Sequence, residues 1–382
     1  MHGSRSIVFV AGEASGDLLA AQVVKELRQR EPGLTCCGVG GDRMIAEGFD
    51  AWVHVRELSV RGYVEVLRHL PRLLRLRREL HRRTAALQPA VFVGIDAPDF
   101  NLGLEEKLRA GGIRTVHFIS PSIWAWRRER LAQIARAVDR MLLVFPFEQQ
   151  IYDEAGIRAS YVGHPLASMI PLAPDATAAR RRLGLAEEGM VVAVLPGSRP
   201  DEIRYLGPTF VAAMAELARG RAGLRFVLPV ADPGLRADIE AMLAVHAGLP
   251  ACVTLTTGRS HDCLEASDVV LVASGTATLE AALFKRPMVI SYRMPWLSAL
   301  IMRRKGYIPY AGLPNILAGE FVVPELLQEA ATPTALAHAV GGFLDDAALR
   351  DRTVARFTEM HFALKRDTAR LAADAILEVA AR

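Results

Sequence analysis

Cysteine is scarce in this sequence, and its spacing excludes the usual roles of paired cysteines. The 382 residues contain four cysteines, none in a C-x-x-C pair and two of them adjacent: Cys36, Cys37, Cys252 and Cys263. A disulfide framework or a zinc site needs cysteines at suitable spacings, so neither is expected. Buried free thiols in a reducing compartment are the simple interpretation.

Long apolar runs are also missing. A helix that crosses a bilayer needs about 18 or more consecutive apolar residues, and the sequence has no such stretch. The N-terminus leads directly into a strand-like run, Ser6 to Val10, and then to acidic Glu13 and Asp17, unlike a signal peptide with its cleavage site. Fixed-period repeats and low-complexity segments are absent as well. We therefore expect a soluble, cytosolic protein.

Short β-branched runs alternate with longer amphipathic segments, which predicts parallel strands with helical crossovers. The runs are residues 7–10, 90–95, 115–119, 141–145, 191–195, 226–230, 252–255, 269–273 and 288–291. This length favours two domains, and Pro165, Pro171 and Pro174 suit a linker between them. We predict two Rossmann-like, doubly wound α/β domains, 1–170 and 171–345. A helical tail, 346–382, is expected to pack back on the N-terminal domain or a partner subunit.

A small turn follows the run 269–273 and leads into a helix-like segment. Its residues are Ser274, Gly275 and Thr276, and such a helix start offers backbone N–H groups and a positive helix end to a phosphate. The alternative is that Ser274 or Thr276 serves only as an N-cap. Glu280 follows one helical turn later, where its carboxylate suits both hydroxyls of a ribose.

A second loop, residues 196–202, follows the first strand of the second domain. Gly197 lets a ligand approach the backbone, Ser198 offers a donor, and Arg199 can fork onto phosphate oxygens. Because no Gly-Lys-Ser/Thr follows, the loop is not a Walker motif, and ATP hydrolysis is disfavoured.

In the first domain, residues 11–17 close the first strand without the G-x-G-x-x-G spacing of dinucleotide sites. Glu13 and Asp17 would repel a phosphate and accept hydrogen bonds from sugar hydroxyls or amides. The alternative is that Ser15 or Asp17 merely caps the following helix.

Asp96 follows the run 90–95 and is the candidate general base. A carboxylate within hydrogen-bond reach can take the proton that an acceptor hydroxyl loses as it attacks a sugar carbon. Asp96 and Asp99 are three residues apart, which is not a D-x-D metal signature. For Asp99, capping of the following helix is at least an equal alternative.

The loop after the next strand carries two tryptophans, Trp124 and Trp126. Indole faces stack on sugar rings and on acyl surfaces, and core packing of one tryptophan is the alternative. His164, at the end of the first domain, is either a hinge residue or an acid or base.

Seven motifs occur in one order: AGEASGD, GIDAPDFN, SPSIWAW, VGHP, LPGSRPDEI, SGTATLEAAL and LPNIL. In this combination, the sequence from about residue 7 to residue 330 resembles the lipid-A-disaccharide synthase family, inverting glycosyltransferases of Gram-negative envelope synthesis. The resemblance implies a GT-B fold, with two Rossmann-like domains facing across a cleft, UDP mainly on the C-terminal one and a final helix crossing back.

The resemblance also implies the reaction. The donor would be UDP-2,3-diacylglucosamine, the acceptor lipid X (2,3-diacylglucosamine 1-phosphate), and the products a β-1′,6-linked disaccharide phosphate and UDP, with neither a metal nor a cofactor. Asp96 resembles the family's essential aspartate, which would deprotonate the acceptor 6-hydroxyl without a covalent enzyme intermediate. We expect UDP contacts from Ser198, Arg199, Ser274, Gly275, Thr276, Glu280 and Asn315, and acceptor contacts from Glu13, Ser15, Asp17 and Trp124.

Eight arginines against two glutamates lie between Arg61 and Arg83, either as a solvated helix face or toward an anionic surface. An apolar stripe of helical spacing runs among them: Tyr63, Leu67, Leu70 and Leu74. Such a helix suits an anionic membrane face, and together with the resemblance it implies peripheral attachment to the cytoplasmic face of the inner membrane. Burial of the stripe in the core is the alternative, and Pro71 is expected to interrupt the helix. Nucleic acid is not an expected partner, and a homodimer is left open.

Two other functions compete with acylated-sugar transfer. A UDP-N-acetylglucosamine 2-epimerase-like isomerase uses a related two-domain scaffold with a soluble substrate and no acceptor. A non-catalytic nucleotide-sugar or lipid-binding module is the third hypothesis. The loop around Trp124 and the arginine-flanked apolar helix favour a lipid substrate, and Asp96 argues for catalysis.

Overall fold

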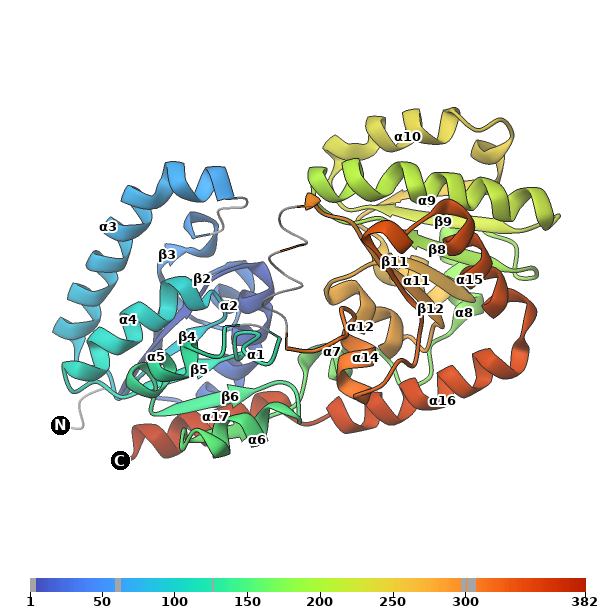
Figure 1. Cartoon of the computed structure of the whole chain (residues 1–382). Coiled ribbons are helices and arrows are strands. Elements are labelled where there is room, and N and C mark those ends of the chain that lie inside the picture. Colours follow the sequence, from blue (N-terminus) through green and yellow to red (C-terminus); the bar gives the residue numbers. More distant parts are fainter. Residues whose placement is uncertain (1–4, 59–62, 126, 297–299, 301–306) are drawn as a thin grey trace. The chain divides into compact units, whose positions relative to one another are not determined.

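The computed structural model describes residues 5–58, 63–125, 127–296, 300 and 307–382, without the side chains of residues 14 and 63–69. The chain divides into two compact units, each built on one parallel sheet (Figure 1). Unit 1 is Met1–Ser168 with Leu364–Arg382, and unit 2 is Met169–Ala363.

Unit 1 contains a seven-stranded sheet in the order β3-β2-β1-β4-β5-β6-β7, with every pairing parallel. The strands are β1 Ser6–Ala11, β2 Thr35–Gly40, β3 Asp50–His54, β4 Val91–Ile95, β5 Thr115–Phe118, β6 Arg140–Leu143 and β7 Ala159–Tyr161. The central strands β1 and β4 are buried along their whole length. Continuous apolar runs are typical of parallel strands covered on both faces.

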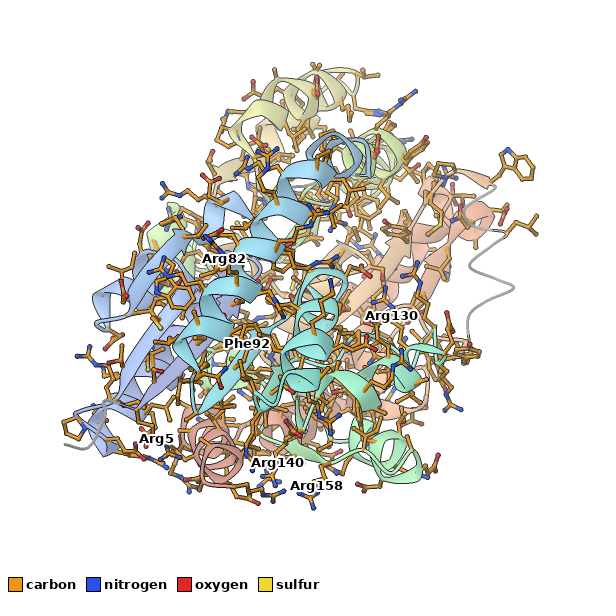
Figure 2. All side chains as sticks on the ribbon, turned by 90° about the vertical axis from the view of Figure 1, so that its left-hand side faces the viewer. Arg5, Arg82, Phe92, Arg130, Arg140 and Arg158 are labelled. Carbon is orange, nitrogen blue, oxygen red and sulfur yellow. The ribbon has the colours of Figure 1, made fainter. Side chains whose placement is uncertain are left out.

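Helices cover the sheet of unit 1. They are α1 Ala14–Arg30, α2 Asp42–Ala46, α3 Tyr63–Leu87, α4 Pro98–Ala110, α5 Arg130–Ala137, α6 Glu148–Glu154, α7 Pro165–Met169 and α17 Thr368–Ala380, with the 3-10 turn η1 Val55–Glu57. Leu80 of α3 and Leu104 of α4 pack in one core cluster with Val8, Val39 and Phe92 from the strands. The buried Phe92 and the outward-pointing Arg82 of α3 mark the inner and outer sides of this layer (Figure 2).

Helix α3 continues through Pro71, so the expected interruption at this residue is wrong. Pro71 is exposed, and its ring therefore lies on the solvent side of the helix. Proline removes one N–H donor from the helix. The C-terminal half of α3 is anchored by the core contacts of Leu76 and Leu80, which offsets the loss of one backbone bond.

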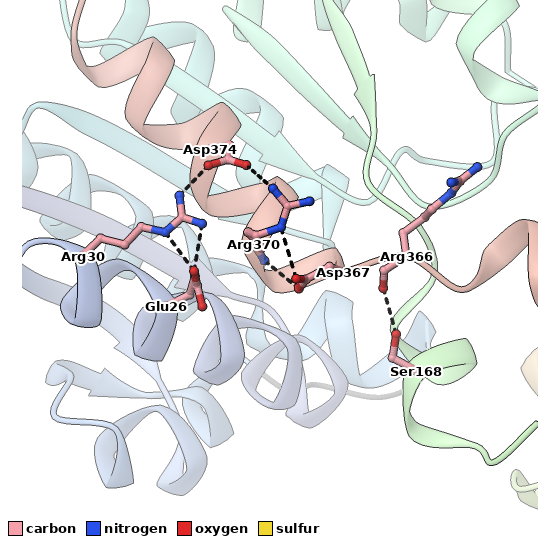
Figure 3. A network of polar contacts seen from close by, with 7 residues as sticks. All are labelled: Glu26, Arg30, Ser168, Arg366, Asp367, Arg370 and Asp374. Atoms are coloured by element: carbon pink, nitrogen blue, oxygen red, sulfur yellow. Dashed lines mark hydrogen bonds and ion pairs between the residues drawn. The ribbon is translucent and has the colours of Figure 1, made fainter.

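The last helix, α17, packs against α1 and against β4, β5 and β6 of unit 1. Asp374 of α17 pairs with Arg30 of α1, which also bonds Glu26 at 2.8 Å (Figure 3). The Ser168 hydroxyl donates to the carbonyl of Arg366 at 3.0 Å and ties the two chain segments of unit 1 together. Exposed ion pairs contribute little individually, so buried residues such as Ala372 and Ile376 carry most of this packing.

Unit 2 contains a six-stranded parallel sheet in the order β10-β9-β8-β11-β12-β13. Its strands are β8 Val191–Leu195, β9 Arg225–Val230, β10 Val253–Thr257, β11 Val269–Ala273, β12 Met288–Tyr292 and β13 Glu325–Leu327. Its helices are α8 Ala176–Leu183, α9 Pro200–Gly220, α10 Arg236–Ala244, α11 Ser260–Ala266, α12 Thr276–Leu283, α14 Leu313–Ala318, α15 Pro333–Asp345 and α16 Ala347–Leu364. The 3-10 turns are η2 Pro233–Leu235, η3 Leu249–Cys252 and η4 Gln328–Ala330.

The expected fold class, two doubly wound α/β domains, is confirmed. The sequence patterns miss four strands, β2, β3, β7 and β13. Three of these, β3, β7 and β13, end a sheet and are only partly buried, so their residues lack a continuous apolar run. β2 was not predicted because its sequence, TCCGVG, consists mainly of glycine and cysteine, which are not β-branched. Within the described residues, no helix is long and apolar enough to cross a membrane.

One carboxyl group lies deep in unit 1, at the start of α6. Glu148 is 1% exposed, and its Oε2 accepts from the N–H of Phe145 at 3.1 Å. Burial raises the pKa of Glu148 to about 7, opposed by hydrogen bonds from Phe145, Ser120 and Trp124 that favour the ionised form. The fully buried Tyr152, one helical turn on, bonds the Ser120 hydroxyl at 2.8 Å. Glu148 thus titrates near neutral pH inside the fold.

Replacing Glu148 with glutamine should change the pH dependence of folding. The folded-state pKa is raised from 4.5 to about 7, so the native protein binds a proton more tightly than the unfolded chain. The stability from this group is fully present below pH 4.5 and is lost as the pH rises to about 7. Relative to Glu148→Gln, the wild-type free energy of unfolding should therefore fall by on the order of 3 kcal/mol over this window.

Urea unfolding at a series of pH values from 4 to 8 measures this difference. Glu154→Gln is the matched control, because Glu154 belongs to the same helix and is exposed. A difference between wild type and Glu148→Gln that stays constant across the series would contradict the raised pKa.

Candidate active site

The turn after β11 in unit 2 has the geometry of an anion site. Gly275 has φ 156° and ψ −164°, a conformation that residues with a Cβ avoid, and α12 begins at the next residue. No side chain caps α12, so the N-cap alternative for Ser274 and Thr276 is wrong. The first N–H groups of a helix have no partner within it, and the positive end of the helix dipole lies beside them. The turn therefore presents donors to an anion.

Neighbouring segments hold this turn in place. The N–H of Ser274 donates to Ser291 at 2.9 Å, and its hydroxyl donates to the carbonyl of Ala311 at 2.7 Å. The Thr278 hydroxyl donates to the carbonyl of Gly275 at 2.8 Å and accepts from the N–H of Leu313 at 3.2 Å. The shape of the turn is thus fixed by contacts with β12 and with the segment that leads into α14.

Glu280 lies on α12, one turn beyond Thr276, and is half-buried. Its Oε1 lies 3.3 Å from the Nε2 of His261 in α11, and the His261 ring meets the edge of Phe284 at 5.3 Å. The hydrogen bond with Glu280 raises the pKa of His261. His261 was missed by the sequence analysis, because nothing in the spacing of α11 and α12 indicates that these residues meet.

The loop 196–199 follows β8, the strand that pairs with β11, so it lies at the same carboxyl edge of the sheet as the Ser274 turn. The Arg199 side chain is 75% exposed, and its Nη1 lies 2.9 Å from Glu202 Oε1. Glu202 Oε2 accepts from the N–H groups of Ser198 at 2.8 Å and Arg199 at 3.3 Å. A Cβ on Gly197 would lie 2.4 Å from that of Glu202, so glycine is required there.

Asn315 is fully buried in α14. Its Oδ1 accepts from the N–H groups of Val322 and Val323, and its Nδ2 donates to Glu325 at 2.8 Å. Glu325 in turn accepts from the N–H groups of Ala311 at 2.7 Å and Gly312 at 2.8 Å. Asn315 therefore supports, through Glu325, the segment that holds Ser274. The structure gives its side chain this supporting role, and a direct UDP contact stays a prediction.

In unit 1, Asp96 lies directly after β4 and is half-buried. Its N–H donates to Phe118 of the adjacent β5 at 2.9 Å. Asp99 is 81% exposed on its side chain and pairs with Arg130, while α4 begins without a side-chain cap. The capping alternative for Asp99 is therefore wrong, and Asp96 is the carboxylate at the carboxyl edge.

The three polar residues that follow β1 differ in exposure and in hydrogen-bond partners. Glu13 and Ser15 are exposed at the start of α1, which has no side-chain cap. Asp17 is 5% exposed, and its carboxylate accepts from three backbone N–H groups at the start of α2: Gly41 at 2.7 Å, Arg43 at 3.2 Å and Met44 at 3.2 Å. The structure thus assigns Asp17 to holding α2. Glu13 and Ser15 remain the accessible candidates for an acceptor.

Trp124 is half-buried within an aromatic cluster at the ends of β5, β6 and β7. Its ring meets Phe147 edge-on at 5.6 Å, Phe147 stacks on Phe145 at 5.7 Å, and Phe145 lies 5.3 Å from the ring of His164. Burial lowers the pKa of His164 to about 4, so it is neutral near pH 7. Its Nδ1 accepts from the N–H of Leu166, which fits the hinge interpretation. Trp126 lies outside the described residues.

The structure describes only part of the predicted apolar stripe on α3. Leu70 is 41% exposed and Leu74 is half-buried, whereas Leu80 further along the helix is core. The side chains of Tyr63 and Leu67 lie outside the described residues. Among the described residues, no group of three His, Cys, Asp or Glu side chains is arranged to hold a metal ion.

The loops of unit 1 that carry Glu13, Asp96 and Trp124 follow β1, β4 and β5, three neighbours in one parallel sheet. The loops with Arg199 and Ser274 follow β8 and β11 of the other sheet. Ligands of such sheets bind beyond the carboxyl ends of the strands. Each unit therefore carries its own candidate site, a carboxylate and indole in unit 1 and a turn that offers donors to an anion, with an arginine, in unit 2.

Solved structures share this two-domain fold at low sequence identity. A glycosyltransferase from Rickettsia africae has a TM-score of 0.61 at 10% identity, covering 100% of this chain and 98% of that one. The Anabaena protein HepE, solved with UDP and glucose, has a TM-score of 0.58 at 14% identity, covering 98% and 99%. UDP-GlcNAc 2-epimerase from Neisseria meningitidis, bound to UDP-GlcNAc, has a TM-score of 0.60 at 11% identity, covering 98% and 99%. Fold alone does not separate transferases from epimerases.

Sequence relatives do distinguish a transferase from an epimerase. A lipid-A-disaccharide synthase of Paraburkholderia phytofirmans is 56% identical over 374 residues, which cover 98% of this chain and 96% of the relative. One of Burkholderia lata is 54% identical over the same length and coverage. The model of the lipid-A-disaccharide synthetase family matches residues 7–378. The resemblance drawn from the sequence motifs is confirmed, and this chain belongs to the lipid-A-disaccharide synthetase family of glycosyltransferases.

Proposed function

We propose that this protein transfers 2,3-diacylglucosamine from UDP to the 6-hydroxyl of 2,3-diacylglucosamine 1-phosphate, forming a β-1′,6-linked disaccharide phosphate and UDP. The observation that carries the proposal is the family match over residues 7–378, which includes every loop of the two candidate sites. HepE, a protein of the same fold, was solved with UDP, which supports a UDP-sugar as donor. An epimerase function is not favoured, since relatives at 54–56% identity are named synthases.

In the proposed reaction, Asp96 takes the proton of the acceptor 6-hydroxyl as its oxygen bonds to the anomeric carbon. The bond between that carbon and the UDP oxygen breaks on the opposite face, so the configuration inverts in one displacement. The negative charge on the departing diphosphate meets the first N–H groups of α12 and the Arg199 guanidinium. Such donors, held in place before the reaction, stabilise charge as it develops. Glu280 would accept the ribose hydroxyls, and Trp124 with Glu13 and Ser15 would contact the acceptor.

The membrane attachment is proposed from α3. Leu70 is exposed, and Arg75 and Arg78 are also exposed on this helix. A helix that exposes a leucine together with cationic side chains suits the interface of an anionic bilayer. Because both substrates carry acyl chains, a protein attached to the cytoplasmic face would meet them at their source.

The variant Asp96→Asn tests the general base. It should bind UDP like wild type but lose disaccharide formation by about 10²- to 10⁴-fold, because an amide cannot accept the hydroxyl proton. UDP release from both purified substrates, and from the donor alone, is the measurement. Asp99→Asn is the control and should keep wild-type turnover, since Asp99 is an exposed carboxylate three positions away. Near-normal turnover in Asp96→Asn would refute its role, and UDP release without acceptor would refute the transfer itself.

The variant Arg199→Ala tests the diphosphate site. Loss of a charge-assisted hydrogen bond should weaken UDP binding by roughly 10- to 100-fold, as measured by calorimetry. The fold should survive, because Glu202 still accepts two backbone N–H groups. Arg219→Ala, in the last turn of the same helix α9, should leave the affinity unchanged. Equal UDP affinity in Arg199→Ala and wild type would exclude this arginine from the phosphate site.

The double variant Leu70→Ser/Leu74→Ser tests membrane attachment. Removing apolar area from the exposed face of α3 should release the protein from sedimenting vesicles that contain anionic phospholipid. Leu87→Ser is the matched control, because Leu87 is 42% exposed at the other end of the same helix. Co-sedimentation of the double variant at the wild-type level would leave this stripe without a membrane role.

A further inference from the structure

The turn that carries Asp96 has an unusual backbone. Asp96 has φ 52° and Ala97 has φ 45°, so two consecutive residues with side chains adopt the left-handed conformation. This conformation costs free energy in any residue other than glycine, and it persists only where the surroundings impose it. Neither residue is glycine, so some other part of unit 1 must hold the turn.

Asn101 is the side chain that holds it. Its Nδ2 donates to the carbonyls of Asp96 at 2.9 Å, Val10 at 3.2 Å and Ile95 at 3.4 Å. Asn101 is fully buried, and its own N–H donates to the carbonyl of Ala97 at 3.0 Å. One residue therefore bonds the backbone of the turn from both its side chain and its main chain. The same amide joins the ends of β1 and β4.

Close packing removes the remaining freedom of the turn. A Cβ on Gly12 would lie 2.3 Å from the Cβ of Ala97, so the loop after β1 presses directly on the turn. The N–H of Gly12 donates to Ile95 at 3.3 Å. On the helix side, a Cβ on Gly94 would lie 2.1 Å from Glu105 Oε1 and 3.1 Å from the Cβ of Asn101. The backbone of the Asp96 turn is thus held by close packing against Gly12 and by the bonds from Asn101.

We propose that Asn101 is a positioning residue, which keeps the Asp96 turn in the left-handed conformation that aims the carboxylate at the acceptor hydroxyl. The inference rests on the proposed role of Asp96 as general base. Without the amide, the carbonyls of Asp96, Val10 and Ile95 each lose the bond from Asn101, and Ile95 keeps only the N–H of Gly12. The turn then relaxes toward an ordinary conformation, which moves the carboxylate. A displacement of about 1 Å at a reacting group can cost roughly 10²-fold in rate. Asn101 touches no substrate in this scheme and acts only through Asp96.

The test compares Asn101→Ala with Leu104→Ala in the full-length protein. Both residues lie on α4 and are fully buried. Leu104 packs in the core cluster with Val8 and Phe92, and it makes none of the bonds that Asn101 makes to the Asp96 turn. Both variants should lose thermal stability. At a temperature where both are folded, Asn101→Ala should lose about 10- to 100-fold in kcat with little change in the KM for the donor, whereas Leu104→Ala should stay within about twofold of wild type.

A second substitution separates positioning from general stabilisation. Glycine adopts the left-handed conformation without penalty, so Ala97→Gly in the Asn101→Ala background should restore part of kcat, about threefold or more. Added stability alone would not raise kcat of protein that is already folded. Equal kcat in Asn101→Ala and Leu104→Ala would overturn the proposal, and so would an absence of rescue by Ala97→Gly.

Asp96→Asn, measured in parallel, distinguishes failure of the positioning role of Asn101 from failure of the base role of Asp96. If Asp96→Asn is inactive while Asn101→Ala keeps wild-type kcat, only the positioning role fails. If Asp96→Asn retains turnover, the proposed base role fails and the positioning role falls with it. UDP affinity should be unchanged in all of these variants, since every substituted residue belongs to unit 1.

Discussion

The loops of this protein depend on buried polar side chains that satisfy backbone groups which no strand can pair. A loop leaving the carboxyl end of a parallel strand exposes N–H and C=O groups, and leaving them unpaired in the interior is costly. The Asn101 amide donates to three carbonyls, those of Val10, Ile95 and Asp96. The Asp17 carboxylate accepts from three N–H groups at the start of α2, and the Glu202 carboxylate accepts from the N–H groups of Ser198 and Arg199. Glu325 does the same for the segment that holds Ser274. The candidate site of each unit has a defined shape because of these contacts.

The same constraint gives polar residues two kinds of role. Arg199 and Glu13 keep exposed side chains that are accessible to a ligand, whereas Asn315 and Asp17 are buried and used by the protein itself. The lipid-A-disaccharide synthetase family match covers both kinds alike. A residue that belongs to a sequence motif therefore indicates a site, but the motif alone does not tell whether that residue contacts the ligand or supports the loop. Burial and hydrogen-bond partners separate the two.

Much of the fold could be predicted because buried parallel strands leave a plain signal. The runs at 191–195 and 269–273 coincide with β8 and β11, and the order of strands and helices indicates two doubly wound domains. Edge strands such as β7 and β13 are short and half-buried, so their sequences carry little of this signal. Asn101 stood within a recognised motif but had no predicted role. Its bond to Val10 spans 91 residues, a separation that local patterns do not report.

The fold class, the family and the chemistry of the glycine-containing turns follow from the residues alone, because apolar periodicity and short motifs are local properties. Tertiary structure decided which polar groups are free. Asp17 and Asp96 both follow the strands of one sheet, yet one carboxylate is bound to the start of α2 and the other is left at the carboxyl edge. The physical reason is that a side chain's partners are set by whichever backbone groups the folded chain leaves unpaired near it. Those groups belong to segments distant in sequence, and only the assembled sheet brings them together.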